Sequence, residues 1–563
     1  MLKAEEKTTD PFKYPAATNP ESVEWAGTPI GKSNTITRTK SRTTVYDKTI
    51  DEKPGRREEL MNAVTTFLAS PEGKKSEIST HDVVIHGIRV RAMTNSKHLT
   101  EFWQDNWYSV SEWKKMTGQE VQATPQVWVY ALGGVNGQAE AAYYSRLTNT
   151  IIFFNTSYYG QLKSWVLGAA GRVLADDFGI HSIHGAVVEK NKVGVLYIAP
   201  TGTGKSTSSY GMMEFPGTRF HSDDWVYIRY ALTTKDGKKV CPNRITPKQG
   251  PEVKGFRCFQ WLEEHQTEDV EVKALTIENT PVMTKPSQID FSKPVEAYAY
   301  VSEKVFYLRC NLVESFPQSA YSILQANLEN VPDVTPEFMK EHEVLLESNL
   351  KAIRGTDHKQ TKEYFAKLSD DQVKTILARL FAFDNARAML DITKVFEPNQ
   401  IFVNPIEPVK LNSVMLLKRN FKEDQVIETL NQDRFMERLL IGETPQGKRE
   451  VAYNGYRAVD EATEFKFIGQ IEKESAETKE PLYHVYLSEE VIPPSLIEEF
   501  ELFRLMHRSC ACYDLNTILQ KDTSIPDRKT AVVTTMKVIA KAMEAKGQEL
   551  KYDISDYKKF IGA

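Results

Sequence analysis

The sequence Val193-Gly194-Val195-Leu196-Tyr197-Ile198-Ala199-Pro200-Thr201-Gly202-Thr203-Gly204-Lys205-Ser206-Thr207 is the stretch from which the rest of the chain can be interpreted. Its first six residues are almost entirely apolar, which predicts a short buried strand. Small, turn-forming residues follow, and the final Lys-Ser-Thr can open a helix. A strand, a glycine turn and a helix in this order are typical of a phosphate-binding loop, because backbone N–H groups and the helix N-terminus hold an anion.

The residue types in this loop predict a nucleotide site. Lys205 is expected to reach the β/γ-phosphates, and the Ser206 hydroxyl to hold a divalent metal ion. Ala199 stands where the strict pattern has glycine, a departure of one methyl group. The alternative is a glycine turn before an ordinary helix, and the complete Gly-Thr-Gly-Lys-Ser-Thr run argues against it. The other residues expected to contact the nucleotide are Thr201, Gly202, Thr203, Gly204 and Thr207.

Length and composition restrict the class of protein. The chain has 563 residues, enough for three to four average domains or for two large lobes. A net charge of −5 gives no support for a nucleic-acid or anionic-membrane partner. No apolar run approaches the roughly 20 residues of a membrane span, and the N-terminus lacks a secretory apolar region. Five mostly scattered cysteines fit a reducing compartment, so we expect a cytoplasmic protein, with Cys510 and Cys512 as core thiols.

Hydrophobic periodicity predicts helices and strands in alternation, and therefore an α/β or α+β fold with mixed sheets. The region from Thr218 to Ile228 reads as strand, interrupted by the pair Asp223-Asp224. From about Ser319 to Arg387 the pattern is helical, with start signals at Thr335-Pro336 and at Ser369. Other expected helices cover 58–68, 99–107, 162–175 and 528–545, and other expected strands lie at 81–91, 126–132, 150–154, 179–188 and 414–417.

Several segments together resemble the ATP-dependent phosphoenolpyruvate carboxykinases, whose superfamily includes the HPr kinase/phosphorylases. The run from Thr156 to Ser164 is similar to the family's Thr-Glu-Tyr-Ala-Gly-Glu-Met-Lys-Lys stretch. Gly179 to His184 resembles the segment that ends in its metal-binding histidine, and Asp223-Asp224 falls where both families carry paired aspartates. Asp384-Asn385-Ala386-Arg387 is similar to the Glu-Asn-Thr-Arg run. The resemblance covers residues 35 to 230 well and residues 380 to 450 in part.

The resemblance implies a two-lobed fold and a set of site residues. It implies an N-terminal substrate-binding lobe over 41–190 and a nucleotide-binding lobe over 191–563, with a helical insertion at about 311–380; composition predicts an extended arm over 1–40. ATP and Mg²⁺ would bind at the loop, and oxaloacetate or phosphoenolpyruvate would be the small-molecule substrate. The implied roles are a second metal ion, Mn²⁺, on His184 and Asp224; Asp223 beside the phosphate metal; Arg387 on the transferred phosphoryl group; Arg42 on a substrate carboxylate; and Tyr158 and Lys163 facing the substrate.

One departure from the family pattern keeps other functions open. The family has two adjacent lysines where this chain has Lys163-Ser164, and the second lysine belongs to the manganese site. A hydroxyl is a weaker ligand than an amine, so the site could serve another substrate. The leading hypothesis is a carboxykinase that converts oxaloacetate to phosphoenolpyruvate, CO₂ and ADP. The alternatives are a kinase acting on a protein or small-molecule hydroxyl, and a non-catalytic nucleotide-binding regulator; the oligomeric state is not indicated.

Overall fold

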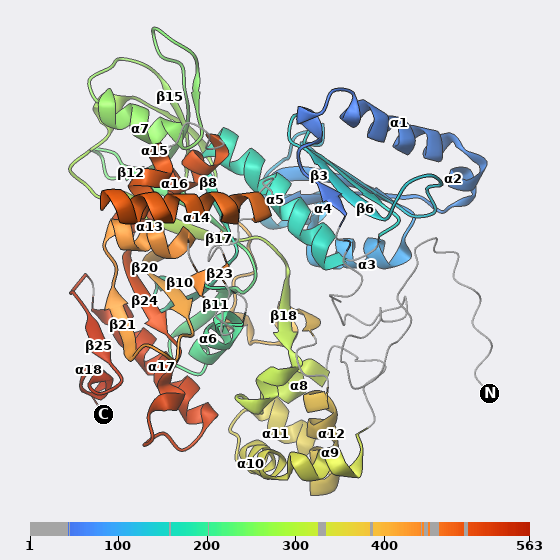
Figure 1. Ribbon diagram of the computed structural model, residues 1–563, viewed down its shortest axis with the longest axis vertical. Coiled ribbons are helices and arrows are strands. Elements are labelled where there is room, and N and C mark those ends of the chain that lie inside the picture. The colour runs from blue at the N-terminus through green and yellow to red at the C-terminus, as the bar shows by residue number, and fades with distance from the viewer. Residues whose placement is uncertain are drawn as a thin grey trace. The chain divides into compact units, whose positions relative to one another are not determined.

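The computed structural model describes residues 43, 45–156, 159–200, 202–324, 334–382, 387–440, 442–443, 449–450, 461–488, 494–545 and 547–562. The chain divides into two compact units, one of Met1–Ala170 with Glu303–Val395 and one of Gly171–Ser302 with Phe396–Ala563. Each is a mixture of helices and sheet (Figure 1). The units are described separately below as unit 1 and unit 2.

Unit 1 is built on a mixed sheet whose described strands have the order β1-β6-β7-β5-β3-β2-β4. Its centre is parallel, since β5 pairs in parallel with both β3 and β7, whereas the outer pairs β2–β3 and β6–β7 are antiparallel. The β2–β3 hairpin turns at His86-Gly87, where both residues have positive φ. The strands are β1 (Tyr46–Asp47), β2 (Ser79–Ile85), β3 (Ile88–Thr94), β4 (Tyr108–Ser109), β5 (Val127–Leu132), β6 (Ala141–Ser145) and β7 (Thr150–Phe154).

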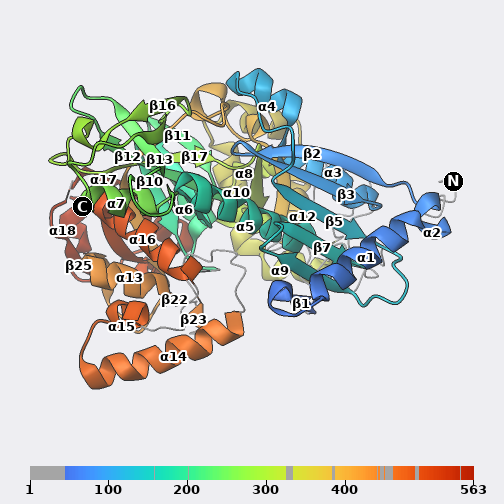
Figure 2. The ribbon, with the colours of Figure 1, turned by 90° about the horizontal axis from the view of Figure 1, so that it is seen from above.

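The two faces of this sheet bury alternate residues of the same strands, as a pleated strand requires. Ile152 and Phe154 of β7 join a core that includes Leu60 and Val64 of α1 (Arg56–Ala69). Figure 2 shows α1 running along the sheet beside β5 and β7. Phe153 points the other way and meets Trp165 of α5 (Tyr159–Phe178) edge to face, with ring centroids 5.5 Å apart. The shorter helices of this part are α2 (Pro71–Lys75), α3 (Lys97–Asn106) and α4 (Val110–Thr117).

The helical region predicted after Ser319 is present, and it belongs to unit 1. Its helices start where the sequence signals stand. The Thr335 hydroxyl accepts the Phe338 N–H, and Ser369 with Gln372 forms the reciprocal capping pair. The elements are β18 (Val305–Arg309), α8 (Ser319–Leu324), α9 (Pro336–Glu341), α10 (Glu343–Arg354), α11 (Lys359–Phe365), α12 (Asp370–Ala382) and β19 (Arg387–Asp391), which pairs with β18.

Unit 2 contains a 14-stranded mixed sheet among its described residues. Its parallel part is formed by β10, β20 and β24, which lie side by side in that order. These strands are buried along most of their length, as expected for parallel strands covered on both faces. The strands are β8 (Ile180–Ile183), β9 (Gly185–Lys190), β10 (Val193–Ile198), β11 (Thr218–Ser222), β12 (Val226–Thr233), β13 (Lys239–Ile245), β14 (Val253–Lys254), β15 (Val272–Thr276), β16 (Pro281–Thr284), β17 (Glu296–Val301), β20 (Val409–Lys418), β21 (Gln425–Thr429), β24 (Ala511–Asn516) and β25 (Lys551–Asp553), with β22 (Gly442–Glu443) and β23 (Arg449–Glu450) in a separate pair.

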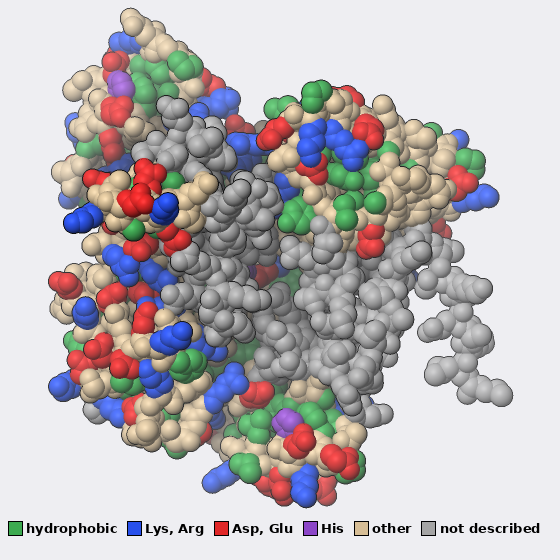
Figure 3. Space-filling view, viewed as in Figure 1, with side chains coloured by type: hydrophobic (Ala, Val, Ile, Leu, Met, Phe, Trp, Pro, Cys, Tyr) green, Lys and Arg blue, Asp and Glu red, His purple; other side chains and the backbone are tan. Residues whose placement is uncertain are grey.

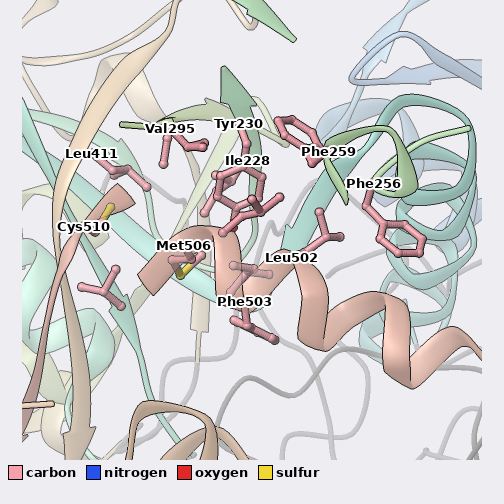
Figure 4. Packing of buried hydrophobic residues seen from close by; sticks show 14 of the residues in the cluster. Ile228, Tyr230, Phe256, Phe259, Val295, Leu411, Leu502, Phe503, Met506 and Cys510 are labelled. Atoms are coloured by element: carbon pink, nitrogen blue, oxygen red, sulfur yellow. The ribbon is translucent and has the colours of Figure 1, made fainter. Parts of the chain in front are cut away.

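Helices cover this sheet and complete one extended core. Leu502 and Met506 of α16 lie beside Ile228 and Tyr230 of β12 (Figure 4). Cys510 and Cys512 belong to the same core, so the prediction of core thiols is confirmed. The helices of unit 2 are α6 (Lys205–Met212), α7 (Arg257–Glu264), α13 (Gln432–Leu440), α14 (Glu461–Thr478), α15 (Leu482–Ser488), α16 (Pro494–Ser509), α17 (Arg528–Glu544) and α18 (Tyr557–Ile561).

The α/β class predicted from periodicity is confirmed, with mixed sheets in both units. The division of the chain differs from the predicted lobes 41–190 and 191–563, because the boundary falls after Ala170, inside α5. The helical segment also clusters with the N-terminal unit and not with the C-terminal one. In the part of the chain that is described, no helix is long and apolar enough to cross a membrane. On the face shown in Figure 3, acidic and basic side chains of the described residues are interspersed.

Candidate functional site

The loop after β10 has the backbone geometry of a tight glycine turn. Gly202 and Gly204 have φ of 82° and 107°, a region that side-chain-bearing residues rarely adopt. Thr203 is buried, and its hydroxyl donates to the Pro200 carbonyl at 2.8 Å, which holds the turn together. Helix α6 begins at Lys205 with Gly204 as its N-cap, a residue that has no side chain to cap the helix. The first N–H groups of α6, those of Lys205, Ser206 and Thr207, therefore can donate to a bound anion.

Lys205 and Ser206 meet the first residue of the aspartate pair. The Lys205 ammonium donates to the Asp223 carbonyl oxygen at 2.7 Å. The Ser206 hydroxyl donates to one carboxylate oxygen of Asp223 at 3.2 Å, and the Ser209 hydroxyl to the other at 2.9 Å. Ser206 and Ser209 lie on one side of α6 because residues three apart in a helix are neighbours. The first two turns of α6 thus hold the aspartate pair beside the glycine turn.

The second aspartate lies beside His184. Their side chains approach to 3.3 Å between His184 Nε2 and Asp224 Oδ1, and the Lys205 ammonium is 3.8 Å from the same oxygen. Strand pairing produces this arrangement, since β8 and β12 are antiparallel with Ile183 opposite Val226. The residue after β8 and the residues before β12 therefore fall side by side.

Gly185, immediately after the histidine, leaves little room for a side chain. A Cβ at Gly185 would come within 2.9 Å of the Leu196 side chain and 3.0 Å of the Tyr197 carbonyl. The close approach of β9 to β10 at this point brings His184 next to the start of the glycine turn, because Gly185 pairs with Ile198.

The donor atoms fit divalent metal ions at two places. Two ligand atoms about 2.1 Å from one ion and at right angles to each other would be about 3 Å apart. The 3.3 Å between His184 and Asp224 and the 3.2 Å between Ser206 and Asp223 agree with this spacing. An imidazole with a carboxylate suits manganese, and a hydroxyl with a carboxylate suits magnesium. Within the described ranges, no three His, Cys, Asp or Glu side chains are clustered to hold an ion. The remaining ligands in either place would therefore be water or a bound substrate.

Burial has the largest effect on the Asp223 carboxyl and raises its pKa. The charge of Asp224 acts in the same direction, whereas Lys205 and the two serine hydroxyls oppose it. Positive charge supplied at this site, by Lys205 or by a metal ion, favours the ionised carboxylate. The protein therefore holds a carboxylate in surroundings that become more favourable when a cation is present.

Lys163, predicted to face a substrate, lies in unit 1 and is buried. Its ammonium is 2.9 Å from Glu303 Oε1, with side-chain exposures of 7% and 6%. It also lies 4.0 Å from the centroid of the Tyr307 ring. The Tyr307 hydroxyl donates to Asn106, which ends α3. Lys163 is thus part of a buried polar cluster that joins α5, α3 and the beginning of β18.

The hydroxyl of Ser164, which replaces the expected second lysine, is used within its own helix. It donates to the Gly160 carbonyl one turn earlier, at 2.7 Å. This bond commits the hydroxyl proton to the helix backbone. A neutral hydroxyl oxygen at this position is a weaker metal ligand than the amine of the expected lysine.

The side chains of four predicted site residues, Arg42, Tyr158, Thr201 and Arg387, are not described by the structure. Arg42, Tyr158 and Thr201 lie outside the described residues, and so do Asp384, Asn385 and Ala386. The backbone of Arg387 is in β19, paired with Arg309, but its side chain is not described.

The structure brings together some residues that the sequence did not single out. Ser209 binds Asp223, and Glu303 neutralises Lys163 across a separation of 140 residues in sequence. No sequence signal marks either of them. No model of a known protein family matches the chain, and no curated protein matches its sequence.

Proposed function

We propose that this protein is a nucleotide-dependent enzyme that transfers a phosphoryl group, with the ATP-dependent conversion of oxaloacetate to phosphoenolpyruvate, CO₂ and ADP as its reaction. One observation carries the proposal. The glycine turn, the aspartate pair and His184 come from three separate segments, and Lys205 contacts both aspartates. A finer proposal follows from the resemblance: a two-lobed carboxykinase-like fold in which unit 2 is the nucleotide-binding lobe.

The chemistry of phosphoryl transfer explains why these residue types would be useful. The reaction needs little covalent help, so catalysis depends on positioning and on stabilising negative charge. The N–H groups of the first turn of α6 and the Lys205 ammonium would hold the phosphates. Ser206 and Asp223 would hold Mg²⁺, and His184 and Asp224 would hold Mn²⁺. Such an ion, when bound, supplies Lewis acidity for polarising a carbonyl or phosphoryl oxygen.

A second candidate is a kinase that phosphorylates a different acceptor, and two contacts favour it. The Lys163 ammonium is neutralised by Glu303, and the Ser164 hydroxyl is bonded to Gly160. The amine ligand that the carboxykinases provide at the position of Ser164 is therefore absent, which would weaken a metal-assisted decarboxylation more than a simple phosphoryl transfer.

The deciding experiment measures CO₂ release from oxaloacetate with ATP, Mn²⁺ and Mg²⁺. We expect CO₂ release above the background with metal ions alone, and we expect this additional release to require both ATP and the protein. Divalent ions alone can act on oxaloacetate, so the matched control is Lys205→Ala at the same metal concentrations. Consumption of ATP without oxaloacetate-dependent CO₂ release, under every metal condition, would replace the carboxykinase by the kinase. The Ser164→Lys variant should release CO₂ at least as well as the wild type if the carboxykinase proposal is correct.

A further inference from the structure

Three loops meet at one edge of the unit 2 sheet, because β10, β20 and β24 are parallel neighbours. Ligands of open α/β sheets bind at the carboxyl ends of such strands. The glycine turn follows β10, Arg419 follows β20 and Thr517 follows β24. The three loops are therefore candidates to act on one ligand.

Hydrogen bonds join these loops into one framework. Thr517 donates through its hydroxyl to the carbonyl of Thr203 in the glycine turn, at 3.2 Å. Its backbone N–H donates to the Lys418 carbonyl at 2.9 Å. The Asn516 side-chain amide accepts the Asn420 N–H at 2.9 Å and donates to the Asn420 carbonyl at 3.0 Å, which ties the loops after β20 and β24 together. A side chain fixed to this framework is held in position before any ligand arrives.

Arg419 is such a side chain. Its Nε donates to the Thr517 hydroxyl oxygen at 3.1 Å. One terminal nitrogen of the guanidinium lies 3.4 Å from the position that a Cβ on Gly204 would occupy. The guanidinium is thus directed at the residue that caps α6, where the N–H groups of the turn and helix converge.

The charge of Arg419 is not neutralised by the described part of the chain. No described carboxylate forms an ion pair with it, although it is half-buried. The charged group that acts on it is a second arginine, Arg528, in the first turn of α17. Burial, with Arg528 adding to it, lowers the pKa of Arg419. A cation in the first turn of a helix and two neighbouring cations are both unfavourable unless an anion is present.

Two neighbouring basic residues, unlike Arg419, form ion pairs with carboxylates. Lys418, one position earlier, is paired with Asp514 at 2.8 Å and with Glu423 at 2.5 Å. Arg438 is 3.3 Å from the same Asp514 carboxylate. Lys418 and Arg438 are therefore neutralised by carboxylates, whereas Arg419, beside Gly204 of the glycine turn, has no ion pair with a described carboxylate.

We propose that Arg419 is a phosphate-binding residue, which together with the glycine turn contacts the phosphate chain of a nucleoside di- or triphosphate, and that Arg528 adds positive charge to the same place. The inference rests on the nucleotide site of the proposed function and is independent of the phosphoryl acceptor. Arg419 supplies from β20 a bidentate donor that the sequence motif around Lys205 does not contain.

The test compares three probes by isothermal titration calorimetry: ATP, inorganic tripolyphosphate and adenosine. Charge-assisted hydrogen bonds of this kind correspond to roughly 10- to 100-fold in affinity. We expect Arg419→Gln to weaken the binding of ATP and of tripolyphosphate by that factor and to leave the binding of adenosine unchanged. The affinities of Arg419→Lys should lie between those of the wild type and of Arg419→Gln. The matched control is Arg434→Gln, which removes an exposed arginine of unit 2 paired with Glu437 at 2.6 Å. A smaller loss, less than about 10-fold, is expected for Arg528→Gln.

The outcomes separate this inference from the proposed function. Wild-type protein that binds neither ATP nor tripolyphosphate overturns both. Binding by the wild type that Arg419→Gln and Arg419→Lys leave unchanged overturns the role of Arg419 alone. If Arg419→Gln weakens the binding of ATP but not of tripolyphosphate, Arg419 contacts the base or the ribose, and the phosphate assignment is contradicted. Equal melting temperatures of Arg419→Gln and the wild type would show that a loss of affinity is not caused by unfolding. If Arg419→Gln does not fold, the same comparison is made with Arg419→Lys.

Discussion

The carboxylate of Asp223 is buried, and its burial is made tolerable by individual side chains that the chain supplies from α6. Two serine hydroxyls bind its oxygens, and the Lys205 ammonium lies at its backbone. Each of these groups is one that the proposed nucleotide or metal ion would also use. The contacts that hold the Asp223 carboxylate are therefore made by the same side chains to which we assign ligand binding.

Replacing Lys205 by alanine should abolish nucleotide binding or weaken it by at least about 10- to 100-fold, since the variant loses a charged donor to phosphate. Calorimetric titration with ATP measures the effect. The control is Lys238→Ala, which removes an exposed lysine of unit 2 paired with Asp236. Unchanged affinity in a variant that melts like the wild type would be incompatible with a nucleotide site at this loop.

The metal assignment is tested on two His–Asp pairs of similar geometry. His184→Ala and Asp224→Asn should each weaken Mn²⁺ binding and slow turnover by about two orders of magnitude, the scale seen when an electrostatic stabiliser is removed. His484 and Asp433 form the comparison pair, exposed and 3.1 Å apart. The matching variants of the comparison pair are His484→Ala and Asp433→Asn. Electron paramagnetic resonance titration measures the Mn²⁺ affinity of all four single variants and so distinguishes the two pairs. Equal Mn²⁺ affinity in all four would show that His184 and Asp224 are not ligands.

At the scale of elements, α5 is tied to the segment that begins β18 by a buried ion pair. Lys163 and Glu303 contact each other inside unit 1, where the Tyr307 ring covers the ammonium. Both charges have left water, so the pair contributes little net stability while it is intact. Removing only one of the two charged groups is destabilising, because the other buried charge then loses its partner in the ion pair.

Glu303→Gln should therefore lower the free energy of unfolding by about 3 kcal/mol. The double variant Lys163→Met/Glu303→Gln should recover most of that loss, since no buried charge remains. Urea denaturation of the two variants measures the difference. Lys304→Met is the control: it removes the neighbouring lysine, whose partner Glu112 is more exposed, and should cost less than about 1 kcal/mol. A single variant as stable as its double would contradict the buried pair.

At the scale of the whole molecule, buried histidines set how stability depends on pH. His181 and His221 lie in the unit 2 sheet, and burial lowers the pKa of each to about 3. In the unfolded chain a histidine titrates near 6.5. Between these values only the unfolded state takes up the proton. The two histidines therefore have no titration effect on stability above about pH 6.5, and they destabilise the fold increasingly as the pH falls from 6.5 toward 3.

We expect the free energy of unfolding to fall by about 1.4 kcal/mol per pH unit for each buried histidine over most of this window. Urea titrations at pH 7, 6, 5.5 and 5 measure the slope before most carboxylates titrate. His181→Gln, which can keep a hydrogen bond to Tyr230, should remove one histidine's share of the slope. His484→Gln, at an exposed position, is the control. An unchanged slope in His181→Gln would mean that His181 accepts its proton in the folded protein.

The sequence by itself determined the local elements around the glycine turn. The apolar run 193–198 is β10, and the helix after Gly204 is α6, because strand and helix propensity and the glycine turn depend on adjacent residues. The start signals at Thr335 and Ser369 were also sufficient to locate the starts of α9 and α12, since a helix cap is a contact between residues three apart. The resemblance to the carboxykinases singled out His184 and the aspartate pair as candidates, but not the distances between them.

Only the tertiary structure decided which distant residues meet. Arg419 and Thr517 reach the glycine turn because β20 and β24 are the parallel neighbours of β10, and no periodicity in the sequence specifies the order of strands in a sheet. The burial of Lys163 depends in the same way on Glu303, whose segment returns to unit 1 after 132 residues of unit 2. Local propensity acts over a few residues, whereas charge pairing and burial depend on which surfaces the folded chain brings together.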